Sequence, residues 1–154
     1  MSVSIEVGIE WDSEKFGKII SRAKDCVALA LKYTAECVWS EVRKRAPVDH
    51  GRLAGSFALE KIDDLAWRVF TNVHYALFVH EGTGIYGPEK HRIVPRRAKF
   101  LSFYWKKVGR HVRFRSVRGM PGRPYAEKSI EYAKSRTQEF AARAVRELFG
   151  GEAG

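Results

Sequence analysis

The sequence predicts an α+β fold in which a mostly antiparallel sheet is flanked by a long N-terminal helix and a C-terminal helix. Two stretches, roughly 13–45 and 124–149, carry apolar residues at every third or fourth position and predict the helices. Short apolar segments between glycine- and proline-rich turns predict the strands. The 154 residues correspond to a single domain, assigned to 1–149, with 150–154 as a frayed tail.

The N-terminal part predicts a strand followed by the long helix. Residues 2–11 alternate between polar and apolar side chains, the period of a half-buried strand. Asp12 or Ser13 can cap the helix over 13–45, and Pro47 ends it. At about 1.5 Å per residue this helix is close to 50 Å long. It exceeds what a small domain usually needs, so we expect part of it to pack on another chain.

The middle of the chain predicts a series of short strands. A continuous apolar character on both faces of 100–105 indicates a central strand or a strand at an interface. The segment 75–80 is compatible with a helical turn or a short strand. The expected strands are 56–62 and 65–73, which form a hairpin around Asp63-Asp64, then 91–95, 100–105 and 111–118, the last with a cationic outer face.

Charge is unevenly distributed along the chain, whose net charge is +10. Residues 90–123 hold 12 of the 28 lysines and arginines and no acid, whereas the remainder has 16 basic and 18 acidic residues. Such a stretch is a strong source of positive potential. Together with its interleaved aromatic residues, this stretch is suited to contact with nucleic acid. The alternatives are acids of a neighbouring subunit or a solvated strand face. The residues expected to act electrostatically or at an interface are Arg92, Arg96, Arg97, Arg113, Arg115, Arg118 and Arg123.

Catalytic and metal-binding patterns are weak. His74 and His80 are six positions apart, which fits neither the helical nor the strand spacing of metal ligands. The glycine-rich loop 82–87 lacks a phosphate-binding signature, and no G-x-S-x-G motif is present. We therefore expect no catalytic residue, no cofactor and no metal. One alternative is a small hydrolase or nuclease in which His74, His80 and Glu81 converge in a cleft.

The sequence also shows no membrane-spanning or secretory pattern. No apolar run approaches the roughly 20 residues that span a bilayer. The segment 1–6 lacks the basic and apolar regions of a secretory signal. We expect no contact with membranes.

Three segments, taken in order, resemble a known family. They are Ala46-Pro47-Val48-Asp49-His50-Gly51-Arg52-Leu53-Ala54-Gly55-Ser56, then Tyr75-Ala76-Leu77-Phe78-Val79-His80-Glu81-Gly82-Thr83, and finally Gly122-Arg123-Pro124-Tyr125-Ala126. Their order and spacing are similar to those of the HK97 gp10-like family of tailed-bacteriophage neck and tail-completion (head–tail connector) proteins. The resemblance covers residues 13–149, nearly the whole chain.

The resemblance implies a non-enzymatic structural protein of the virion. Such proteins form homo-oligomeric rings, commonly sixfold, at the head–tail junction or the tail terminus. The implied partners are neighbouring neck, portal-side or tail-tube proteins and packaged DNA, and the location is the virion neck or tail, reached from the host cytoplasm. An alternative is a basic nucleic-acid-binding protein without catalysis. Residues expected to set loop geometry, for neighbour contacts or for turns within one subunit, are Pro47, Gly51, Glu81, Gly82, Thr83 and Pro124.

Overall fold

The computed structural model describes residues 13–48 and 50–150, so the strand expected over 2–11 lies outside the described residues. The fold is α+β, as predicted. The helices are α1 (Ser13–Arg45), α2 (Arg52–Gly55), α3 (Ala76–Glu81), α4 (Tyr125–Ser135) and α5 (Thr137–Phe149), with a 3-10 turn η1 (Gly84–Tyr86). The strands are β1 (Ala58–Asp63), β2 (Ala66–Phe70), β3 (Leu101–Trp105) and β4 (Arg110–Phe114).

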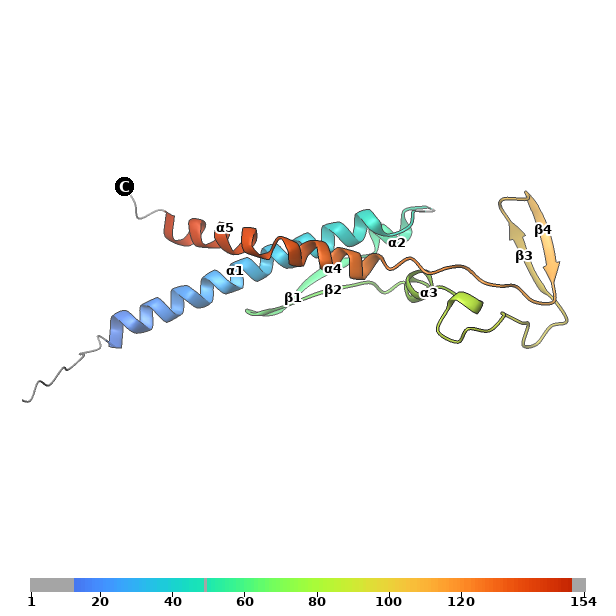
Figure 1. Cartoon of the computed structure of the whole chain (residues 1–154), viewed down its shortest axis with the longest axis horizontal. Coiled ribbons are helices and arrows are strands. Elements are labelled where there is room, and N and C mark those ends of the chain that lie inside the picture. Colours follow the sequence, from blue (N-terminus) through green and yellow to red (C-terminus); the bar gives the residue numbers. More distant parts are fainter. Residues whose placement is uncertain (1–12, 49, 151–154) are drawn as a thin grey trace, which may run out of the picture.

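Helix α1 forms the long axis of the molecule and has the bounds that its apolar period predicts. Its last turn carries three cations, which suit the negative end of the helix dipole. There Glu41 accepts hydrogen bonds from Lys44 Nζ and Arg45 Nη2, both at 2.9 Å. Helices α4 and α5 run back along α1, and the β1–β2 hairpin also packs against it (Figure 1).

The prediction of a single C-terminal helix was wrong, because the helix divides at Arg136 into α4 and α5. Hydroxyl groups on both sides of the break bond to helix carbonyls. Ser135 Oγ donates to the carbonyl of Tyr132 (2.7 Å), and Thr137 Oγ1 donates to that of Ala133 (3.4 Å). The N–H of Arg136 closes a tighter turn on Ala133. Such local bonds compete with the regular helical pattern.

The strands form two separate antiparallel pairs, β1–β2 and β3–β4, where one sheet was expected. Strand β3 is therefore not a central strand. The expected strand 91–95 is reduced to one bridge between Ile93 and Val117, and the strand expected over 111–118 ends at Phe114. The ambiguous segment 75–80 is helical, as α3. Asp63 and Asp64 stand at the β1–β2 turn, as predicted, where Asp63 Oδ1 accepts the N–H of Leu65 (2.7 Å).

The buried core lies at the C-terminal end of α1, where α1, α2, α3 and α4 meet. Its members are Val42, Ala46, Leu53, Ala76 and Tyr125. Buried side chains continue along α4 and α5, at Ala133, Phe140 and Ala144. The first half of α1 is exposed, with Ile19 and Ile20 in contact with solvent. At the other extreme the β3–β4 hairpin projects beyond the C-terminal end of α1 (Figure 1).

Candidate interaction surface

The three sequence segments that carry the family resemblance meet in the core. Ala46 and Leu53 come from the first segment, Ala76 from the second and Tyr125 from the third. Tyr125 joins them: its hydroxyl donates to the carbonyl of Ala76 (3.0 Å), and its ring meets Phe57 and His80 edge-on at 5.9 and 5.0 Å between centroids. Burial raises the pKa of this phenol. The motif residues thus tie distant parts of the chain to one point.

Near this core, two backbone segments, 82–85 and 118–122, contact each other at glycine residues. We call Gly82, Gly84, Gly119 and Gly122 the glycine clasp. A Cβ at Gly84 would lie 2.1 Å from the carbonyl oxygen of Arg118, and one at Gly119 would lie 2.0 Å from that of Thr83. Gly82, Gly84 and Gly119 also have φ between +66° and +90°. Only glycine combines these angles with such close approach.

Hydrogen bonds close the clasp on both sides. The N–H of Thr83 donates to the carbonyl of Met120 (2.9 Å), and the N–H of Met120 donates to Thr83 Oγ1 (3.0 Å). The N–H of Ile85 donates to the carbonyl of Arg118 (2.9 Å). We call the segment 90–123 the basic arm. The clasp holds the two ends of this arm together, and the β3–β4 hairpin in its middle forms the projecting tip (Figure 1).

The basic arm presents all seven arginines singled out from the sequence. Each is exposed, and none forms a side-chain hydrogen bond or ion pair with another residue in the described part of the chain. They do not gather at one spot: Arg113 lies on β4, Arg115 directly follows it, and Arg118 and Arg123 lie near the clasp. Arg92, Arg96 and Arg97 lie on the outgoing pass before β3. The arm is thus cationic along its length.

Large aromatic side chains on the hairpin are exposed together with the cations. Phe103, Tyr104 and Trp105 are 40, 54 and 41% exposed, and Phe114 is 36% exposed. No other described helix or strand packs extensively against the hairpin. The apolar character of 100–105 predicted a central strand or a strand at an interface. The exposure of β3 in the single chain excludes the first alternative and leaves the second as a prediction.

The residues expected to set loop geometry occupy different places. Gly51 has φ +72° and precedes α2, and Pro47 follows α1. Pro124 stands directly before α4. Thr83 is part of the clasp, whereas the side chain of Glu81 is exposed at the end of α3. Gly82 makes its contacts within the chain, against Gly122 and Met120.

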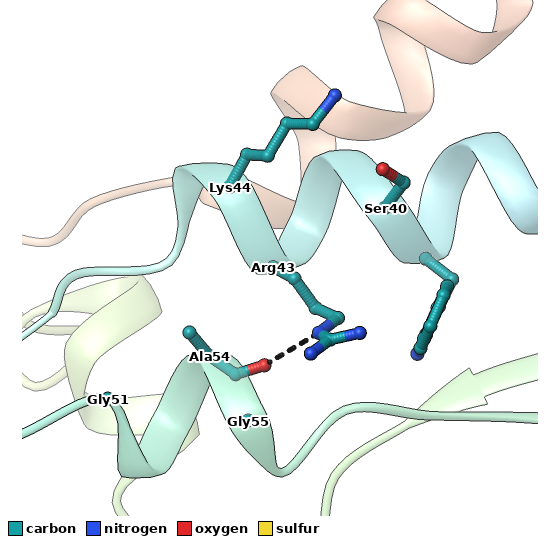
Figure 2. Close-up of a pocket in the computed structure, with 7 residues that line it drawn as sticks. Ser40, Arg43, Lys44, Gly51, Ala54 and Gly55 are labelled. Carbon is teal, nitrogen blue, oxygen red and sulfur yellow. Dashed lines mark hydrogen bonds between the residues drawn. The ribbon is translucent and has the colours of Figure 1, made fainter.

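An open hollow of about 440 Å³ lies between α1 and α2. Figure 2 shows that the Arg43 side chain reaches across it, and its Nε donates to the carbonyl of Ala54 (3.3 Å). The guanidinium also stacks over the Trp39 ring at 4.5 Å. The lining contains cations but no carboxylate. Its contacts are those of a structural link between α1 and α2.

A second open hollow, of about 500 Å³, lies beside the clasp. It includes two of the three residues that the hydrolase or nuclease alternative requires. His80 and Glu81 line it, but His74 does not, so the three residues do not converge. His80 Nε2 instead donates to Glu127 Oε1 (2.8 Å). Hydrogen bonds from its own backbone N–H and from His80 lower the pKa of the Glu127 carboxyl. No local sequence pattern signals this pair, because its members are 47 positions apart.

Metal ligands do not cluster among the described residues: no three histidines, cysteines or acids lie close enough together to hold an ion. Cys26 and Cys37 are both free thiols. None of the described helices combines the length and apolar character that crossing a bilayer requires. Comparisons with protein-family models, with curated proteins and with solved structures gave no match.

Proposed function

We propose that this chain is a structural virion protein of a tailed bacteriophage that forms an oligomeric ring at the head–tail junction or the tail terminus. It acts by binding copies of itself and the neighbouring neck, portal-side or tail-tube proteins, without catalysis. Its place is the virion neck or tail after assembly in the host cytoplasm.

The proposal depends on one observation: the three segments converge on a single core cluster, and two of them supply Gly82, Thr83 and Gly122 of the glycine clasp that holds the basic arm. A shared function for the segments 46–56, 75–83 and 122–126 is then to hold this arm in a fixed direction. A projection on each subunit that is held at its root suits a head-to-tail contact, in which different surfaces of two copies meet and closure yields a ring.

The proposal predicts that reversing charge on the hairpin blocks assembly without unfolding the chain. In the double variant Arg113→Glu/Arg115→Glu, repulsion from acidic surfaces replaces attraction, so rings and joined necks should be lost. The residues are exposed, so the free energy of unfolding should remain within about 0.5 kcal/mol of the parent. Electron microscopy and native mass spectrometry measure the rings, and urea unfolding measures the fold.

The matched control is Lys128→Glu/Lys134→Glu, which reverses two exposed cations on α4. It changes net charge by the same amount and should assemble normally. Normal ring formation by the hairpin variant, or a parent chain that remains a monomer at high concentration, would refute the proposal.

A second candidate function is nucleic-acid binding, which the exposed aromatic rings between the exposed arginines of the arm favour. Cations bind phosphates and exposed rings stack on bases. Binding of a DNA duplex or single strand that weakens steeply as salt rises would support it, and absence of binding at low salt would remove it.

A further inference from the structure

The β3–β4 hairpin has two chemically different faces. Cross-strand pairs lie on the same face, and the register pairs Leu101 with Phe114 and Phe103 with Val112. Trp105 shares this face with its cross-strand partner Arg110 at the turn end, and the rings of Phe103 and Trp105 approach Phe114 at 6.1 and 6.2 Å. A two-stranded hairpin is marginally stable in water unless a third strand or another element covers its apolar face. This face therefore lacks a cover within the described chain.

The outer edge of β4 is suited to one kind of additional strand. Each strand of a two-stranded sheet has an open edge with unpaired backbone groups. Along β4 the other face carries His111 and Arg113, with Arg115 following, whereas β3 carries the uncharged Ser102 and Tyr104 there. Cations on an edge oppose pairing with a second cationic hairpin. A strand that is apolar on one side and acidic on the other satisfies both faces.

The chain contains one segment of this chemistry, residues 2–11, which lies outside the described residues. It has two acids and no lysine or arginine. Glu6 and Glu10 are even-numbered, so they fall on the face of a strand opposite the odd-numbered apolar residues. Those apolar residues are Val3, Ile5, Val7, Ile9 and Trp11.

The reach of the chain determines which copy supplies the segment. The hairpin lies beyond the C-terminal end of α1 (Figure 1). Residues 1–12 directly precede α1 in the sequence. The 33 residues of α1 span about 50 Å. Twelve residues, even fully extended, span at most about 42 Å. The segment cannot meet the hairpin of its own chain, but it can meet that of another copy.

We propose that residues 2–11 of a second copy add as a strand to the β4 edge of the hairpin. Their apolar side chains cover the apolar face, and Glu6 and Glu10 lie beside Arg113 and Arg115. The donor segment precedes the N-terminal end of α1 in the sequence, and the acceptor edge lies beyond the C-terminal end of α1. Each copy can therefore give a strand to one neighbour and receive one from another. This inference rests on the proposed self-assembly and names the contact that produces it.

A charge-exchange experiment on the full chain tests the contact. Two variants are made, Glu6→Lys/Glu10→Lys and Arg113→Glu/Arg115→Glu. Each alone should weaken self-association at least about tenfold, because like charges face each other across the contact. An equimolar mixture should recover association, since the acidic segment of one variant then meets the cationic edge of the other and the reversed pair is likewise complementary. Sedimentation and native mass spectrometry measure the masses, and Lys128→Glu/Lys134→Glu is the control.

Each outcome of the charge exchange either supports or overturns the contact. Recovery in the mixture supports pairing between copies. A mixture that stays dissociated overturns the proposal. The proposal also fails if the Glu6→Lys/Glu10→Lys variant associates normally while Arg113→Glu/Arg115→Glu loses binding to duplex DNA, because the hairpin then holds nucleic acid. If the Glu6→Lys/Glu10→Lys variant still forms closed rings, only the strand addition is overturned and the proposed ring stands. If association is lost in each variant and recovers in the mixture, but the products are open dimers, only the proposed ring is overturned.

Discussion

Replacing Gly119 by alanine is expected to open the glycine clasp and to release the root of the basic arm. The new Cβ would lie 2.0 Å from the carbonyl oxygen of Thr83 and 2.8 Å from the backbone nitrogen of Gly84. Both are backbone atoms, which cannot rotate away as a side chain would. The two backbone segments of the clasp must therefore separate. The hydrogen bonds that join Thr83 to Met120 and Ile85 to Arg118 are then lost.

Gly109 in the β3–β4 turn offers a matched control. Its φ of +68° is also unfavourable for alanine, but no atom lies within 4 Å of its Cβ position. Gly109→Ala should therefore cost only about 1–2 kcal/mol for the left-handed conformation. Gly119→Ala should cost at least about 2 kcal/mol more, since the hydrogen bonds lost with the clasp are worth about 1 kcal/mol each. Urea unfolding and tryptic cleavage within 84–123 measure the difference. Equal losses in both variants would show that the contact distance is unimportant.

The clasp also shows where sequence reasoning reaches its limit. Gly82 and Gly119 were each recognisable as loop residues, because glycine next to proline and other glycines indicates turns. Their partners are about 37 positions away, as between Thr83 and Met120, and no local periodicity records a contact at that separation. By contrast, the bounds of α1 follow from apolar residues every three or four positions and from Pro47, all of which are local.

The two strands of the β3–β4 hairpin were predicted from local patterns, but a central position for 100–105 was wrong and an interface position stays a prediction. The alternation over 111–114 is local and identifies a strand, so β4 was found. What covers the apolar face depends on tertiary or quaternary contacts, and a burial pattern alone does not distinguish a core from an exposed interface. The arginines were easier to place, because a segment without any acid has no local partner to neutralise them.

Tyr125→Ala is expected to destabilise the chain more than a typical point substitution, by about 3–5 kcal/mol. The ring is 7% exposed and contacts Phe57 and His80, so its removal leaves a cavity at the point where three segments meet. Tyr125→Phe retains the ring and removes only the hydrogen bond to the carbonyl of Ala76. That loss should cost about 1 kcal/mol.

Tyr86 supplies the comparison, because its side chain is 48% exposed. Tyr86→Ala should change the free energy of unfolding by less than about 1 kcal/mol. Urea unfolding followed by tryptophan fluorescence ranks the three variants. Tyr125 packs against α3 next to the root of the basic arm. Tyr125→Ala should therefore also lower the yield of rings at temperatures where the chain remains folded. Tyr125→Phe keeps the ring contacts and should not lower it. A Tyr125→Ala chain as stable as Tyr86→Ala would mean that the convergence of the three segments does not hold the arm.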